Sequence, residues 1–137
     1  MGLDQYAGLL VQESDGTSDI ESYKFTWRKH ARLQQFFVNE YKKQHKTKSG
    51  DEISETKEKL GFNSGDGGVK ITRRLIKRLA KEVAKGYPNS VAKDGFFWGQ
   101  QWQEESVITY KKQDEDFVKW CRKELKAGKQ ILYDCWW

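Results

Sequence analysis

The four consecutive residues Trp27-Arg28-Lys29-His30 combine side chains that could act together on a phosphorylated ligand. An indole ring can stack on a nucleotide base, and the neighbouring guanidinium and ammonium groups can clamp a phosphate. Residues one and two positions apart point to different faces of a helix, so only part of this set can share one surface. The alternative interpretation places Trp27 in the core and its charged neighbours in water.

Other catalytic and metal chemistry finds little support in the sequence. The only two histidines, His30 and His45, do not have the spacing of metal ligands. Nucleophilic catalysis would require Cys121 or Cys135 beside His30, and the glycine run at 63–68 lacks the lysine and hydroxyl ending of a P-loop. We therefore predict no metal, no cofactor and no catalytic residue. Two reduced thiols are favoured over a bridge between the cysteines, which the sequence leaves open.

Positive charge is concentrated in two blocks of the chain. Residues 1–22 hold five acids and no base, whereas residues 23–49 and 70–93 each hold eight Lys or Arg against a single Glu. Two such blocks on one face would attract phosphates or an acidic partner. The simpler interpretation is two solvated helix faces. The second block predicts a basic helix face that could bind nucleic acid with little sequence preference, made of Arg73, Arg74, Lys77, Arg78 and Lys81.

The run Gly95-Phe96-Phe97-Trp98-Gly99 is too short for a helix and is bounded by glycines. We expect its rings to lie in a loop against the core, with a stacking platform for a ligand as the second interpretation. Because aromatic residues make up 14% of a chain that is only 36% hydrophobic, they must supply much of the core volume.

Hydrophobic periodicity predicts the elements that position these side chains. Helices with a three- and four-residue apolar spacing are expected over 25–43, 73–85 and 104–126, the last with a break near Gln113. Extended segments are expected over 3–12, 69–71 and 130–137, and the polar stretch 44–68 is expected to be a flexible loop. The sequence thus predicts a single domain over 1–137. We expect an α+β fold in which about three helices pack on a small antiparallel sheet that includes the N- and C-terminal strands.

Several spaced motifs resemble a family of small proteins of bacteriophages and some bacteria. That family typically begins Met-Gly-Leu-Asp-Met-Tyr, as residues 1–6 nearly do, and carries a Trp-Arg-Lys helix, a capped second helix, a Gly-Phe-Phe-Phe-Gly loop and a final strand that ends on Trp. Its members often bear the label phosphoglycerate kinase, a two-domain enzyme whose nucleotide loops this chain lacks. The resemblance points to Asp4, which could pair with Arg28, and implies no secure activity.

Together these observations predict a small phage-type accessory protein that is not an enzyme. We expect it to bind an anionic partner, either an acidic host or defence protein or a nucleotide-like ligand. The alternatives are a nucleic-acid-binding protein that uses the helix 73–85, and a small enzyme that acts on a phosphorylated metabolite through Arg28, Lys29 and His30. No apolar run approaches the roughly 20 residues that span a bilayer, so we expect a protein of the host cytoplasm with no membrane contact. The aromatic terminal strand could also pair with a second copy in a homodimer.

Overall fold

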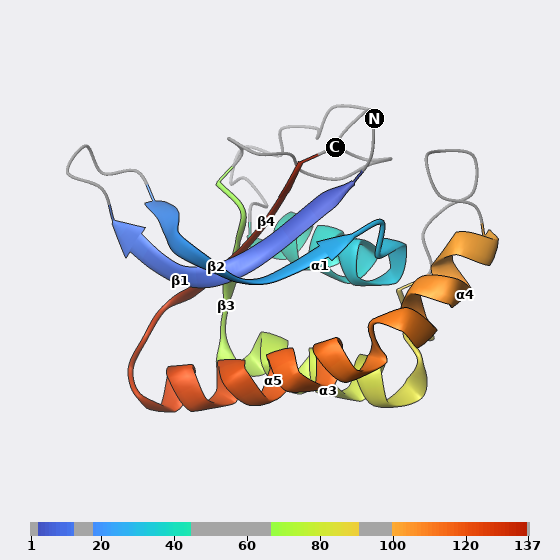
Figure 1. Ribbon diagram of the computed structural model, residues 1–137. Coiled ribbons are helices and arrows are strands. Elements are labelled where there is room, and N and C mark those ends of the chain that lie inside the picture. Colours follow the sequence, from blue (N-terminus) through green and yellow to red (C-terminus); the bar gives the residue numbers. More distant parts are fainter. Residues whose placement is uncertain (1–2, 13–17, 45–66, 91–99, 137) are drawn as a thin grey trace.

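The computed structural model describes residues 3–12, 18–44, 67–90 and 100–136, and it has one four-stranded sheet and four helices in these ranges (Figure 1). The elements in chain order are β1 (Asp4–Gln12), β2 (Ser18–Arg28), α1 (Ala31–Gln44), β3 (Val69–Ile71), α3 (Arg73–Lys85), α4 (Gln100–Thr109), α5 (Lys111–Lys126) and β4 (Ile131–Trp136).

The sheet is antiparallel, with the strand order β2-β1-β4-β3. The two terminal strands are neighbours at its centre, where Asp4 of β1 lies opposite Trp136 of β4. The predicted α+β class and the pairing of the N- and C-terminal strands are therefore confirmed.

One face of the sheet packs against the helices, as the two-residue period of a strand allows, although in β4 the consecutive residues Ile131, Leu132 and Tyr133 are all buried. Trp27 of β2 and Tyr133 of β4 lie on the buried face. The helices supply the other side of the core, because Phe117 of α5 packs edge-on against Trp27 at 5.0 Å and Phe37 of α1 stacks on Tyr133 at 3.7 Å between ring centroids. The core is thus strongly aromatic, as the composition predicts.

The expected helix over 25–43 begins six residues later than predicted. Residues up to Arg28 belong to β2, an element that the sequence analysis did not anticipate. Phe25 and Trp27 point to the core, whereas the residues between and after them are exposed, which is the two-residue period of a strand. Because the helical period of α1 begins directly after this short alternation, the two segments look like one helix in the sequence. Lys29, with a φ of 58°, turns the chain from the strand into the helix. The proposed Trp-Arg-Lys helix is therefore a strand end and a turn.

Helix α3 follows the predicted boundaries. The Thr72 hydroxyl accepts a hydrogen bond from the Leu75 amide at 3.1 Å, which caps the N-terminus. Gly86 ends the helix in the left-handed conformation, with a φ of 75°, and the Tyr87 amide then donates to the Glu82 carbonyl.

The expected helix over 104–126 is divided at Tyr110 into α4 and α5. Among the described residues, no helix is both long and apolar enough to cross a membrane.

Candidate functional site

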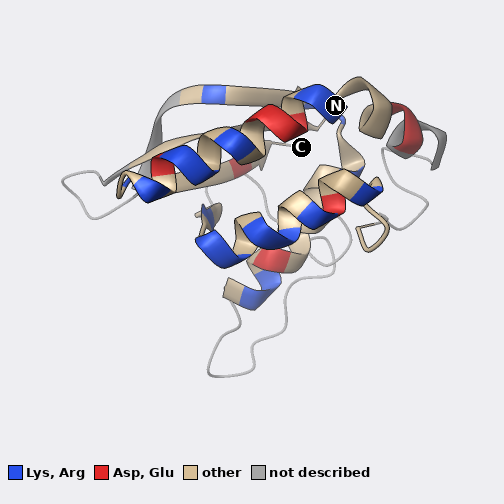
Figure 2. Ribbon diagram, turned by 90° about the horizontal axis from the view of Figure 1, so that it is seen from below, with Lys and Arg blue, Asp and Glu red and all other residues tan. Residues whose placement is uncertain are grey.

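The basic helix α3 lies between α5 and α1 (Figure 2), and four of its cations line hollows against one neighbour or the other. Arg73 and Lys77, four residues apart, line a hollow together with α5. Arg78 and Lys81 line another hollow together with α1. Residues three and four apart share a helix face, which explains this division. The five predicted cations therefore do not form one surface.

The hollow on the α5 side is lined by cations from both helices. Arg73 and Lys77 of α3 face Arg122 and Lys126 of α5 around a volume of about 530 Å³. Ile76 and Leu125, also among the lining residues, supply apolar surface. We call this hollow, lined by these six residues, the basic groove. No acidic residue is among its described lining, so four positive charges of the groove have no acidic partner within it.

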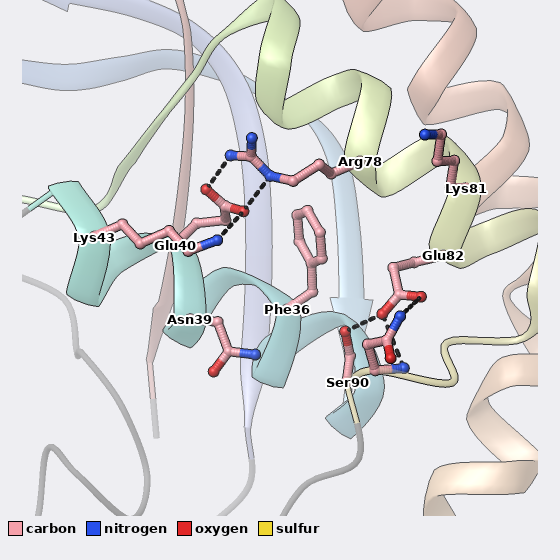
Figure 3. Close-up of a pocket in the computed structure, with 9 residues that line it drawn as sticks. Phe36, Asn39, Glu40, Lys43, Arg78, Lys81, Glu82 and Ser90 are labelled. Atoms are coloured by element: carbon pink, nitrogen blue, oxygen red, sulfur yellow. Dashed lines mark hydrogen bonds and ion pairs between the residues drawn. The ribbon is translucent and has the colours of Figure 1, made fainter.

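The hollow on the α1 side, shown in Figure 3, has its positive charge largely offset. The guanidinium of Arg78 donates two hydrogen bonds to the carboxylate of Glu40, at 2.9 and 2.6 Å, and Lys43 approaches the same carboxylate at 3.7 Å. This paired geometry raises the pKa of Arg78, mainly through its hydrogen bond to Glu40. A second acid, Glu82, accepts a hydrogen bond from the Ser90 hydroxyl at 2.8 Å. The arrangement ties α3 to α1 and to the turn that follows α3.

The buried carboxyl group of Asp114, at the start of α5, lies within hydrogen-bond distance of three polar groups from distant parts of the chain. The Trp27 indole donates to Oδ1 at 2.8 Å, and the Tyr87 hydroxyl donates to Oδ2 at 2.7 Å. The His30 Nε2 atom also lies 2.7 Å from Oδ2. Asp114 is only 1% exposed, and His30 is fully buried. We call Asp114, Trp27, His30 and Tyr87 the Asp114 cluster.

The Asp114 cluster continues into a second polar network through the backbone of His30. The Gln5 side chain accepts from the His30 amide at 2.8 Å and donates to the His30 carbonyl at 3.0 Å. It also donates to the Tyr133 hydroxyl, which in turn donates to Gln34. The remaining ring nitrogen of His30, Nδ1, is buried without a hydrogen-bond partner among the described atoms. Burial also raises the pKa of Tyr87 and of Tyr133 well above the usual range for tyrosine.

The Trp27-Arg28-Lys29-His30 run does not converge on one surface. Trp27 and His30 point into the core, whereas Arg28 and Lys29 are exposed. Arg28 pairs with Asp4, its cross-strand neighbour, at 3.8 Å, and both side chains are mostly in solvent. The Asp4–Arg28 contact that the sequence suggested thus exists, but it joins two strands at the surface, where such pairs contribute little stability.

Three of the predicted site residues, Phe96, Phe97 and Trp98, lie outside the described part of the chain, as does most of the expected loop 44–68. Within the described ranges, no group of His, Cys, Asp and Glu could hold a metal ion. Cys121 and Cys135 are buried and are not bridged.

The α5 half of the basic groove was not among the residues predicted from the sequence. Arg122 and Lys126 follow Val118 at four and eight residues, which places them beside the apolar stripe of α5. That position was readable from the sequence. What could not be read is that α5 packs antiparallel to α3, so that the two pairs of cations meet.

Comparisons with known proteins do not identify this chain. Neither protein-family models, nor curated proteins, nor solved structures yielded a match to this chain.

Proposed function

We propose that this protein is a non-catalytic binding module for an anionic partner, and that the basic groove is its binding surface. The observation that supports this proposal is the set of four cations from two helices around one hollow with no acid in its described lining. Like charges held close together repel one another, and an anion placed among them relieves that repulsion. The phage-type role in a host cell rests on the sequence resemblance alone.

The N-terminus of α3 adds to the positive electrostatic potential of the groove. Arg73 is the first residue of that helix, whose first turn contains no acidic residue. Helix N-termini carry a partial positive charge, which favours an anion and disfavours a cation such as Arg73. An anionic partner would therefore interact with the helix end as well as with the side chains.

The test is a pair of charge reversals matched in net charge. Arg73→Glu combined with Lys77→Glu changes two lining residues, whereas Arg74→Glu combined with Lys85→Glu makes the same change at two exposed positions of α3 outside the groove. Binding of fluorescent polyglutamate would be measured by anisotropy over a range of salt concentrations. We expect the groove variant to lose at least about tenfold in affinity and to show a flatter salt dependence. Equal losses in both variants would mean that only net charge matters, which refutes the groove.

Nucleic acid remains the second candidate partner, because phosphodiester chains are recognised by the same kind of cation array. The same variants, titrated with a single-stranded oligonucleotide, measure this alternative directly. The enzymatic alternative has weaker support from the geometry, because His30 is buried while Arg28 and Lys29 are exposed. It predicts loss of activity when all three are replaced by alanine.

A further inference from the structure

The basic groove is the first of three neighbouring hollows along the contact between α3 and α5. A second hollow, of about 230 Å³, shares Arg122 with the basic groove. A third, of about 350 Å³, shares Val83 and Ala84 with the second and reaches Lys111 at the start of α5. We call these three hollows, each of which shares lining residues with the next, the seam. Because α3 has 13 residues and rises about 1.5 Å per residue, the seam runs for about 20 Å.

The seam has aliphatic as well as charged lining residues. Ile76, Val83 and Val118 lie buried at its base, whereas Ala84 is exposed and Ala80 and Leu125 are partly exposed. Both helices contribute, and every hollow contains aliphatic side chains. The aliphatic lining residues of the first two hollows are Ile76, Ala80, Val83, Ala84, Val118 and Leu125. Val107 and Ile108 of α4 extend this surface at the far end, where Ile108 is 78% exposed. An apolar strip flanked by charge is typical of a surface that receives the apolar face of a partner.

Charge is distributed unevenly along the seam. The four cations of the basic groove lie at one end, where Arg73 and Lys126 belong to opposite helices. The middle hollow has Lys119 and Arg122 but also the acidic Glu115. The far hollow has Lys111 beside the buried Asp114. A partner that matches this gradient would be acidic at the end that meets the basic groove and closer to neutral at the other.

On the basis of the proposed function, we infer that the partner is an acidic amphipathic helix of another protein, which lies along the seam with its acidic end at the basic groove. A helix of about 13 residues matches the length of the seam. Its apolar residues at three- and four-residue spacing would pack on the aliphatic floor, and its acidic flanks would pair with the cations. A nucleic-acid backbone would use the cations alone and leave the accessible aliphatic surface of Ala84, Leu125 and Ile108 in water.

The test uses synthetic peptides of roughly 16 residues, a length at which an isolated helix is marginal but a bound one can form. One peptide places Leu on a single helical face and most of its Glu near one end. The other has the same composition in an order that spreads Leu around the helix. With the wild-type protein we expect the first to bind at least about tenfold more tightly, while a single-stranded oligonucleotide binds more weakly than either. Equal affinities for the two peptides would overturn the inference.

A matched pair of variants tests the apolar floor. Ala84→Gln places a polar side chain at an exposed position shared by two hollows, and Ala127→Gln makes the same change after α5, at a residue that lines none of the three. We expect Ala84→Gln to lower the affinity for the amphipathic peptide about fivefold and to leave the affinity for the scrambled peptide unchanged. We expect Ala127→Gln to change neither affinity. Unchanged affinity in Ala84→Gln would contradict the inference.

Orientation gives a further readout. A spin label on the acidic end of the peptide should broaden the methyl NMR signals of Ile76 and Leu125 and spare that of Val107. The opposite pattern would contradict the charge gradient.

The outcomes of these experiments also separate the anion-binding function from the inference of a helical partner. If both peptides bind equally and both depend on Arg73 and Lys77, the anion-binding function stands and the helix inference fails. If neither peptide nor the oligonucleotide binds, both fail. If the oligonucleotide binds most tightly, the helix inference fails and nucleic acid is the partner class.

Discussion

The buried carboxyl group of Asp114 offers the sharpest test of how this fold is held together. Asp114→Asn keeps the size and shape of the side chain but replaces one acceptor oxygen with an amide that donates. The Trp27 indole and the Tyr87 hydroxyl donate to different oxygens of the carboxyl group, so the new NH₂ group faces one of these two donors. At least one donor is left unpaired in a site that is 1% exposed.

A buried donor without an acceptor costs about 1–3 kcal/mol. Since one or two donors lose their partner, we expect the substitution to lower the free energy of unfolding by about 2–4 kcal/mol. That is a large part of the roughly 5–15 kcal/mol typical of a domain. It corresponds to a fall in melting temperature on the order of 10 °C.

The assay is urea unfolding, monitored by tryptophan fluorescence and by far-UV circular dichroism. The m value, which is the slope of the unfolding free energy against urea concentration, is compared between variants. Asp116→Asn, the same chemical change two residues later at an exposed position, is the control, and it should lie within about 0.5 kcal/mol of the wild type. If Asp114→Asn is no more destabilising than Asp116→Asn, the three hydrogen bonds do not contribute as the geometry implies.

Three further predictions concern buried or constrained positions. The pKa values of Tyr87 and Tyr133 are raised in the folded protein, so their contribution to stability is fully present below about pH 10. At higher pH that contribution is lost, because the same tyrosines ionise first in the unfolded chain. Absorbance near 295 nm should therefore show these two rings ionising only when the protein unfolds. Burial likewise raises the pKa of the Cys121 thiol, so Ellman's reagent should react with it only after denaturant is added, and rapid reaction of the native protein would contradict its burial. Gly86→Ala should lower the free energy of unfolding by about 1 kcal/mol, because alanine is strained at the positive φ of this position. Gly68→Ala should lower it clearly more, because its new Cβ would also lie 2.7 Å from the Tyr133 carbonyl oxygen. Urea unfolding measures both changes.

The elements that local chemistry determines could be predicted from the sequence. Thr72 and Gly86 mark the two ends of α3 because a hydroxyl cap and a left-handed glycine are satisfied within one turn of the helix. The terminal strands were also predictable, since both are apolar runs bounded by polar or glycine-containing segments. Their pairing followed from the need to bury them in a chain of this length.

The strand β2 could not be predicted in the same way. Its inward residues Phe25 and Trp27 alternate over only a few positions before the helical spacing of α1 begins. What holds the segment extended is non-local, because Trp27 packs on Phe117 and pairs with Gln5 of β1. Contacts this far apart in sequence override a weak local pattern.

The role of Asp114 was hidden by its neighbours. The acidic run 114–116 has the composition of ordinary charge partners of a helix N-terminus, and Glu115 and Asp116 are indeed exposed. Asp114, however, precedes Phe117 and Val118 by three and four residues, which places it on the buried face of α5. That spacing was available in the sequence, but its hydrogen-bond partners come from residues 27, 30 and 87, which only the fold brings together.

The Asp114 cluster and the basic groove are connected through the rotation of α5 about its own axis. Asp114, Phe117 and Cys121 all face inward, so hydrogen bonding at the first turn and packing at the next two fix which side of the helix meets the core. With that side fixed, the row of Glu115, Lys119, Arg122 and Lys126, at three- and four-residue spacing, must lie at the boundary with α3. The same rotation brings Arg122 and Lys126 opposite Arg73 and Lys77. The buried network thus determines not only the stability of the fold but also where its unpaired positive charge gathers.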